Sequence, residues 1–351
     1  MKFLAGLYTV LFCLHVLPAP PVLAWETEKV IVVLIDGLRY SDGLGSPDSL
    51  CVPRMKALSK QGTKIEPFLN DGITKTSRAV PAIWCGAWTP IEEFSDSSCG
   101  GVFNNHSVLP TVFEYYRKGL DRPLDDCVYV IKELCSWKGS LDPDYGPEFW
   151  PTYHTVGSSD TDVWQEARRI LETQSPGFML LYLADVDLRG HDGDWEEYVR
   201  AVATADEIVG ELWELVQWLP DYSGKTTLFV TNDHGRHTHD FQNHGDDCEG
   251  CRTIQLLAVG PDIKRGWVSN TTRSIPDLTP TVGALLGFPA PMASGSVMTS
   301  TSGQGWTSVW GQTSASISIS AGRAGGRSTA GSNTLPMSPA VIAIPGSPSN
   351  R

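Results

Sequence analysis

The sequence predicts an α/β fold: a mostly parallel, doubly wound central sheet with helices on both of its faces. Three observations support this prediction. Apolar, β-branched runs alternate with amphipathic stretches of helical periodicity, and three of those runs lead directly into an aspartate. The chain of 351 residues, 41% of them hydrophobic, is long enough to build a large core, so wholesale disorder is excluded.

Four apolar runs predict the strands. They are apolar on both faces, which is typical of the central strands of a parallel sheet. The runs cover residues 29–37, 177–186, 226–230 and 255–260. Asp36 lies at the end of the first run, and Asp187 and Asp233 follow the second and third. Because ligands in such sheets bind beyond the carboxyl ends of the strands, we expect these three aspartates to lie on one rim.

Helical periodicity fills the intervals between the strands. Apolar residues recur at spacings of three and four over residues 195–219, and Pro220 ends this predicted helix. Shorter helices are predicted at 109–118 and at 277–286, the latter ended by Gly287. The sequence contains no internal repeat, so we expect one domain over residues 25–300.

The two ends of the chain differ from this domain. Residues 1–24 combine Lys2, an apolar stretch and the small residue Ala24, which predicts a signal peptide and a secreted or periplasmic protein. A short uncleaved anchor is the alternative. Residues 301–351 lack Asp, Glu and Lys and are rich in Ser, Thr and Gly, which predicts a disordered tail. No apolar run reaches the length of a spanning helix.

Charge and cysteine content restrict the partners and the covalent structure. The net charge of −13 argues against a nucleic-acid duplex or an anionic membrane as the main partner. Export would make disulfides the default, but seven cysteines follow residue 24, so at least one is unpaired or pairs between chains. We interpret Cys248-Glu-Gly-Cys251 as a local disulfide, with a redox pair or a further metal site as alternatives. The other five are Cys51, Cys85, Cys99, Cys127 and Cys135.

Histidines and aspartates concentrate in one part of the chain. Five of the eight histidines lie between His191 and His244, among several aspartates. Carboxylates on one rim repel one another unless cations compensate their charge, and mixed Asp and His ligands suit zinc better than magnesium or calcium. For a single residue a solvated loop is the simpler interpretation, but the set indicates a metal centre. His237 and His239 either support the ligands or lie in a surface loop.

The order of these motifs resembles the alkaline phosphatase superfamily, and most closely its nucleotide pyrophosphatase/phosphodiesterase-type branch, over roughly residues 29–290. The matching segments are Asp36, Thr74-Lys-Thr76, Asp187-Leu-Arg-Gly-His191, Asp233-His234-Gly235 and His244-Gly245. The resemblance implies a three-layer α/β/α fold with two zinc ions. Asp187, His191 and His244 would bind one ion. Asp36, Asp233 and His234 would bind the other, with Thr76 as a further ligand and as the nucleophile.

The resemblance implies a phosphodiesterase or phosphatase that acts on a small phosphate ester through a phosphothreonine, and the predicted signal peptide implies that this enzyme is exported. A threonine hydroxyl is a poor nucleophile unless a cation stabilises its alkoxide. Two cations held about 4 Å apart can bind the attacking and leaving oxygens of an in-line displacement. Only eleven positions separate Asp233 from His244, where nucleotide-cleaving relatives carry a long insertion, so we expect an open site.

Some positions depart from the family pattern. Arg78-Ala79-Val80 replaces the family's Pro-Asn or Pro-Gly and His after the threonine, and Ser77 is a rival nucleophile. The Asn that would contact the phosphoryl group falls near Ser97, so Asn104 or Asn105 is the candidate, although Asn105-His-Ser also fits a glycosylation acceptor. Arg78, Arg39 and Lys75 are candidates for contact with a substrate anion.

Three alternative functions follow from the same residues. A sulfatase would need a Cys or Ser in a Cys/Ser-x-Pro-x-Arg motif, and the segment after Thr76 lacks it. A phosphoglycerate mutase would need a serine nucleophile and a cytoplasmic setting. A metal-stabilised binding module without turnover remains the alternative from another class.

Overall fold

The computed structural model describes residues 25–48, 51–95, 103–132 and 137–299. The predicted signal peptide (1–24) and tail (301–351) lie outside the described residues, as do Ser97, Cys99 and Cys135. The boundaries of the domain therefore remain a prediction. No helix among the described residues is long and apolar enough to cross a membrane.

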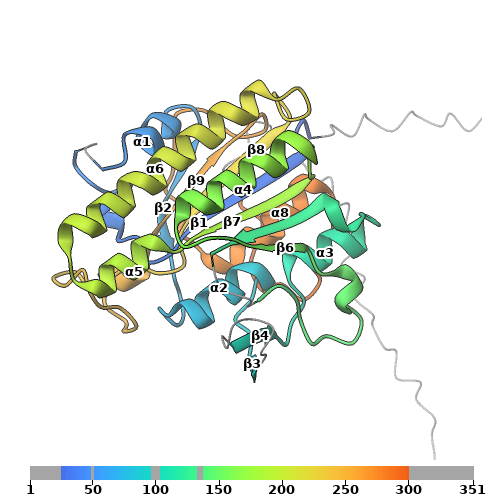
Figure 1. The fold of residues 1–351 in the computed structure, drawn as a ribbon, viewed down its shortest axis with the longest axis horizontal. Helices are drawn as coiled ribbons and strands as arrows, with labels where there is room; N and C mark the ends of the chain where they lie inside the picture. The colour runs from blue at the N-terminus through green and yellow to red at the C-terminus, as the bar shows by residue number, and fades with distance from the viewer. Residues whose placement is uncertain (1–24, 49–50, 96–102, 133–136, 300–351) are drawn as a thin grey trace, which may run out of the picture. The chain divides into compact units, whose positions relative to one another are not determined.

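A mixed, mostly parallel sheet forms the centre of the protein (Figure 1), which confirms the predicted fold class. Its order is β10-β2-β9-β8-β1-β7-β5-β6, with β11 also paired to β2. The strands β8, β1, β7, β5 and β6 run parallel, whereas β9 is antiparallel to both β8 and β2. The strands are β1 (Lys29–Ile35), β2 (Thr63–Leu69), β5 (Cys127–Ile131), β6 (Thr152–Thr155), β7 (Phe178–Leu183), β8 (Thr226–Thr231), β9 (Thr253–Val259), β10 (Trp267–Ser269) and β11 (Arg273–Ser274).

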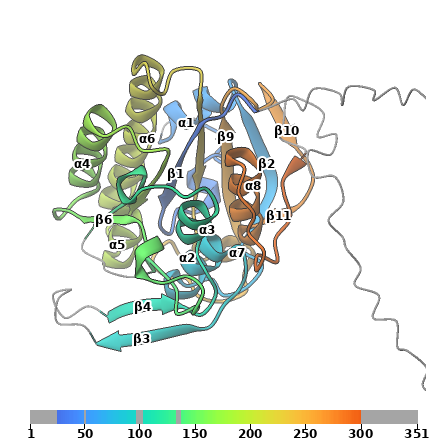
Figure 2. The same cartoon turned by 90° about the vertical axis from the view of Figure 1, so that its right-hand side faces the viewer.

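Helices cover both faces of this sheet (Figures 1 and 2). One apolar core includes residues of α1 (Pro53–Ser59), α4 (Asp160–Thr173) and α6 (Trp195–Trp218). The other includes residues of α2 (Thr76–Cys85), α3 (Val112–Gly119) and α8 (Leu278–Leu286). The remaining elements are short: α5 (Asp185–Asp192), α7 (Glu249–Arg252), the 3-10 turns at 40–42, 124–126, 147–149 and 275–277, and a separate pair of strands, β3 (Ile91–Ser95) and β4 (Phe103–Ser107).

The sequence of β1 explains its central position. Val30, Val32 and Leu34 pack in the core with α2, α3 and α8, whereas the alternate residues from Ile31 to Ile35 pack in the core with α1, α4 and α6. Because successive side chains of a strand point to opposite faces, a strand that is apolar at every position is stable only with a layer on each side. Burial of each such side chain contributes about 1.5–3 kcal/mol.

One predicted boundary is wrong. The strand expected over 177–186 ends at Leu183, and α5 begins at Asp185, so Asp187 lies in the first turn of a helix. Gly193, at φ 78°, ends α5. Asp194 then caps α6 by accepting the backbone N–H groups of Glu196 and Glu197, which restarts the helix in a new direction.

Candidate active site

Three neighbouring strands bring three aspartates together. The order β7-β1-β8 places Asp187, Asp36 and Asp233 at adjacent carboxyl ends of parallel strands. Their side chains belong to residues that are only 8%, 4% and 0% exposed, respectively. The rim that the sequence predicts is therefore present, and it is buried rather than solvated.

Two glycines allow this close approach. Gly37 follows Asp36 at φ +64°, and a Cβ there would lie 2.4 Å from Oδ1 of Asp187. Gly190, one turn after Asp187, faces Arg236, and a Cβ there would lie 2.3 Å from the guanidinium carbon. Both positions require glycine because a methyl group would occupy the space of a charged group at the site.

The histidines join the aspartates in two overlapping groups. Ligand atoms of Asp36, Asp233 and His234 lie within 4.8 Å of one another, and so do those of Asp187, His234 and His244. The rings of His234 and His244 stack, with centroids 3.8 Å apart. His191 is more exposed, but its Nε2 lies 3.0 Å from Nε2 of His244 and 3.4 Å from Oδ2 of Asp187. All six predicted aspartate and histidine ligands therefore lie in one cluster.

The tautomers of two histidines suit a metal. His234 donates from Nδ1 to the carbonyl of Gly235 (3.0 Å), and His244 donates from Nδ1 to the carbonyl of Thr74 (2.9 Å). A carbonyl oxygen only accepts, so each Nδ1 carries the proton and each Nε2 presents a lone pair to the cluster. Oδ2 of Asp233 is buried and lacks a hydrogen-bond partner among the described residues. These donors fit divalent cations that bind oxygen and imidazole nitrogen.

The electrostatics show the same need for positive charge. Burial, followed by the charges of Asp233 and Asp187, raises the pKa of Asp36 well above its ordinary value. Burial also opposes ionisation of Asp187, but a hydrogen bond from His191 and the charges of His234 and Arg236 lower its pKa to about 2. The aspartates of this rim therefore cannot all ionise at low energy unless further positive charge is supplied.

Thr76 lies at the start of α2 and faces this cluster. Its Oγ1 lies 3.0 Å from Nε2 of His234, and 3.3 and 3.4 Å from the two carboxylate oxygens of Asp36. The hydroxyl thus shares its neighbours with the Asp36, Asp233 and His234 group. This is the position that the family resemblance implies for the nucleophile.

The altered sequence after Thr76 still forms a helix. Pro81 has no N–H group, so it cannot donate to the carbonyl of Ser77 four residues earlier. The guanidinium of Arg78 donates to that carbonyl instead, at 3.1 Å. Arg78 therefore supplies the hydrogen bond that the Ser77 carbonyl would otherwise lack in the first turn of α2. Gly86, at φ 66°, ends the helix.

Two residues of the site were not predicted from the sequence. Arg236 is fully buried and donates to the carboxylate and carbonyl of Asp187, to the carbonyl of Gly37 (3.1 Å) and to that of Gln242 (2.8 Å). Tyr182, on β7, donates its hydroxyl to Asp36. The only available signal was the position of Arg236 directly after the Asp233-His234-Gly235 motif, where a charged side chain normally indicates a solvated loop.

Other predicted contacts lie elsewhere. Asn105 is buried in β4, with Oδ1 unpaired among the described residues, and no described contact joins it to the cluster. Asn104 lies in the same strand. Arg39 forms an ion pair with Asp42 at 2.7 Å, so its guanidinium is already engaged. The carbon chain of Lys75 lies beside Gly245, next to the predicted ligand His244.

The predicted disulfide between Cys248 and Cys251 is not formed. Both residues carry free thiols, as do Cys51, Cys85 and Cys127. The expectation of a disulfide at this position is therefore wrong for the structure.

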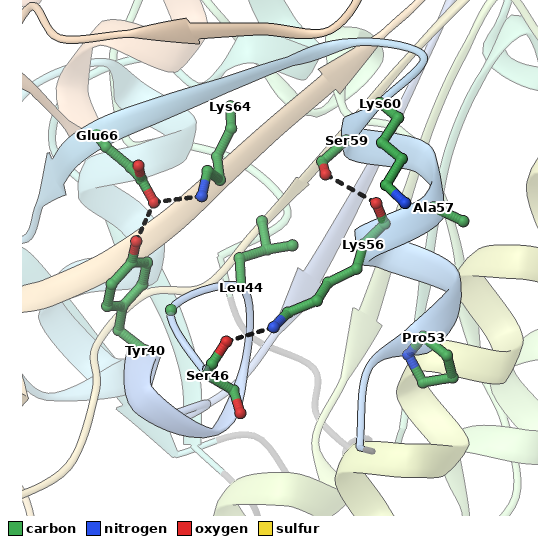
Figure 3. Close-up of a pocket in the computed structure, with 11 residues that line it drawn as sticks. Tyr40, Leu44, Ser46, Pro53, Lys56, Ala57, Ser59, Lys60, Lys64 and Glu66 are labelled. Atoms are coloured by element: carbon green, nitrogen blue, oxygen red, sulfur yellow. Dashed lines mark hydrogen bonds and ion pairs between the residues drawn. The ribbon is translucent and has the colours of Figure 1, made fainter. Parts of the chain in front are cut away.

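A separate hollow of about 480 Å³ lies between α1, the turn at 40–42 and β2 (Figure 3). Two of its three lysines are engaged: Lys56 donates to the carbonyls of Ser46 and Asp48, and Lys64 pairs with Glu66 at 2.6 Å. None of the residues that line it belongs to the Asp and His cluster.

The comparisons with known proteins agree with this fold and with a cluster of side chains that could bind metal ions. The sequence model of the Metalloenzyme superfamily matches residues 152–287, a segment that contains five of the six predicted ligands but neither Asp36 nor Thr76. The match covers less than half of the chain and supports the resemblance to the alkaline phosphatase-like superfamily. The predicted resemblance is thereby confirmed at the level of the superfamily.

Individual relatives show how far the similarity extends. A 2,3-bisphosphoglycerate-independent phosphoglycerate mutase of Desulforudis audaxviator is 31% identical over 120 residues, which cover 32% of this chain and only 21% of the relative. A phosphopentomutase of Symbiobacterium thermophilum is 31% identical over 140 residues, or 33% of its length. The chain thus matches between a fifth and a third of these curated relatives. The solved structure of murine ectonucleotide pyrophosphatase/phosphodiesterase 5 has a TM-score of 0.54 at 15% identity, covering 75% of this chain and 96% of that one.

Proposed function

We propose that this protein hydrolyses small phosphate esters, with Thr76 as the nucleophile and two divalent cations, zinc by preference, as cofactors. The observation that carries the proposal is the position of the Thr76 hydroxyl, 3.0 Å from Nε2 of His234 and within 3.4 Å of both oxygens of Asp36. Because this hydroxyl lies beside side chains that could bind a metal ion, it could bind the same ion. Coordination to a metal ion stabilises the alkoxide and so activates a threonine as a nucleophile.

Each residue of the site has a distinct role in this proposal. His234, Asp36 and Asp233 would hold one cation beside Thr76, and Asp187, His191 and His244 would hold the other. When bound, the two cations would stabilise the alkoxide, the leaving oxygen and the hydrolytic water. Arg236 orients Asp187, and Tyr182 orients Asp36, so each ligand is fixed by a second hydrogen bond. Thr76 accepts the phosphoryl group, and water then releases it.

The similarity to solved structures also bears on the alternatives. The structural relatives include a 2-O GAG sulfatase, with a TM-score of 0.58 at 12% identity. The similarity covers 78% of this chain and 73% of that chain. At this identity the likeness concerns the fold alone. Thr76 and Ser77 followed by Arg78 lack the sulfatase motif, which favours phosphate esters. An inactive variant of the murine phosphodiesterase in complex with AMP is also among the structural relatives, so a nucleotide is one substrate to test.

The central test compares Thr76→Ala with Ser77→Ala. The substrates are p-nitrophenyl phosphate, bis-p-nitrophenyl phosphate and p-nitrophenyl sulfate, with zinc or manganese added to metal-depleted protein. We expect Thr76→Ala to lose turnover while it retains its metal content, and Ser77→Ala to remain active. Acid quenching during turnover, followed by peptide mass spectrometry, should find phosphate on Thr76. Normal turnover in Thr76→Ala would refute the assignment, and inactivity of the wild-type protein on all three substrates would favour a binding module.

We also propose that the protein is exported, because residues 1–24 have the composition of a signal peptide. The expected product is a chain that begins at Trp25, with the domain at 25–300 and the tail at 301–351. Sequencing the N-terminus of the protein recovered from the extracellular or periplasmic fraction tests the cleavage. An intact Met1 terminus in the cytoplasmic fraction would contradict it.

A further inference from the structure

A second group of metal-binding side chains lies beside the proposed active site. It consists of His237, Asp246, Cys248 and Cys251, whose ligand atoms lie within 4.8 Å of one another. Nε2 of His237 lies 3.2 Å from Oδ2 of Asp246. The Cys251 thiol interacts with both the Cys248 sulfur and the Asp246 carboxylate. None of the four belongs to the set of ligands proposed for catalysis.

Backbone packing holds this group together. The two cysteines are three residues apart, at either end of the first turn of α7, so both sulfurs can reach one point. The backbone of this turn lies directly against that of residues 235–238. A Cβ at Gly250 would lie 2.4 Å from the carbonyl oxygen of Arg236, and a Cβ at Gly235 would lie 2.0 Å from that of Gly250. Glycine at both positions therefore lets the cysteine turn approach His237.

The chemical state of each donor suits a cation. Nε2 of His237 is shielded from solvent, and within the described structure it has no hydrogen-bond partner. Nδ1 of the same ring lies 3.7 Å from Oδ2 of Asp240, a carboxylate that can orient the ring from behind. The carboxylate of Asp246 is fixed through its other oxygen, which accepts the backbone N–H of Cys248 at 3.0 Å. Both thiols are free.

We propose that His237, Asp246, Cys248 and Cys251 form a third, structural zinc site. With ordinary zinc–ligand bonds, tetrahedral geometry separates the ligand atoms by about 3.3 Å for N and O and about 3.8 Å for two sulfurs. The observed separation between His237 and Asp246 already matches the first value. Thiolate sulfur selects zinc over magnesium and calcium, and four protein ligands leave no open position for substrate. The site is therefore structural rather than catalytic.

The position of this site gives it a defined role. His237 and Asp246 lie at the two ends of a loop that carries His244, a proposed ligand of the active site. The Asp246 carbonyl accepts the hydroxyl of Thr74 at 2.7 Å, and the Thr74 carbonyl accepts Nδ1 of His244 at 2.9 Å. A cation bound at both ends of the loop would fix His244 and the segment that leads into Thr76. Loss of this cation would loosen the active site without removing any of its ligands.

Cobalt substitution tests the site independently of activity. The ligands proposed for catalysis contain only nitrogen and oxygen, so thiolate-to-cobalt charge-transfer absorption in the near ultraviolet reports the third site alone. We expect this absorption in the full-length protein, prepared under reducing conditions and reconstituted with Co²⁺, together with one more equivalent of zinc than the active site needs. Absence of the absorption would overturn the proposal. A mass two hydrogens lower, with Cys248 and Cys251 linked in the peptide map, would overturn it in favour of a disulfide.

Single-residue variants test which side chains give rise to the cobalt absorption. Cys248→Ser and His237→Asn should each lose the absorption or shift it and lose about one equivalent of zinc, whereas Cys51→Ser, a cysteine outside the group, should change neither. Cys248 is preferred to Cys251 because it is only half-buried, so its replacement disturbs the core less. Unchanged zinc content and unchanged cobalt spectra in both variants would refute the assignment. Thr76→Ala should keep the absorption, so failure of the proposed hydrolysis and failure of this site are distinguishable.

Discussion

Substitution of Gly190 by alanine tests the packing beneath the active site. In an ordinary helix this change stabilises a protein by about 0.5–1 kcal/mol, because glycine loses more backbone entropy on folding. Here the new methyl group would lie 2.3 Å from the guanidinium carbon of Arg236 and 2.5 Å from its Nη2. Overpacking in a core costs about 1–3 kcal/mol, and displacement of the guanidinium would also break its buried ion pair with Asp187, which costs about 3–5 kcal/mol.

We therefore expect Gly190→Ala to lower the free energy of unfolding by about 3 kcal/mol. Helix propensity alone would raise it, so the two effects have opposite signs. The measurement is urea unfolding in the presence of a chelator, so that bound metal does not contribute. Leu188→Ala is the matched control, because Leu188 lies in the same helix and is 46% exposed, and its effect should stay within about 0.5 kcal/mol. A Gly190→Ala protein as stable as wild type would show that Arg236 does not need this space.

Three further predictions concern other buried groups. Glu114 accepts hydrogen bonds from Thr111, Ser140 and Trp150, so Glu114→Gln should destabilise the protein by about 1–3 kcal/mol in urea unfolding; no measurable change would contradict this. Burial and the charge of Asp185 raise the pKa of Asp160 from 3.8 to about 7, so the native state favours its protonated form. Wild type should therefore lose up to about 4 kcal/mol of stability relative to Asp160→Asn as the pH rises from about 4 to about 8, and a stability difference independent of pH would refute this. Removal of the metal ions with a chelator should lower the midpoint of thermal unfolding, since the clustered carboxylates then lack compensating charge, and zinc should restore it.

The sequence predicted the rim of the site because its signal is local. Asp36 directly follows a buried apolar strand and Asp233 follows another after one residue, and the parallel order of those strands is enough to place them side by side. The approach of Thr76 could be inferred only through the family resemblance, since the contact between α2 and the strand ends is long-range. Asp187 was expected just after a strand, and its place in α5 was missed because the apolar run continues through Val186 into the helix.

Other features could not be predicted for identifiable reasons. Charged residues after a strand normally face solvent, so nothing in the sequence separates the buried Arg236 from a surface arginine. Two cysteines three residues apart favoured a disulfide, and the proximity of His237 and Asp246, which supports the proposed metal site, is a feature of the folded structure alone. The start of α4 did carry a signal: Ser159 and Asp162 form a reciprocal cap, a pattern that is readable from the sequence.

The position of β1 has a consequence for biosynthesis. This strand is made early, but both of its neighbours come much later: β7 begins at Phe178 and β8 at Thr226. At typical translation rates of about 5–20 residues per second, roughly 7–30 seconds pass between the synthesis of Ile35 and that of β7, the first of the two partners to be made. During that interval an uninterrupted apolar segment has no partner strand on either side. An unpaired apolar strand is prone to aggregate, so we expect the nascent chain to be most vulnerable until β7 and β8 are made and the centre of the sheet can close.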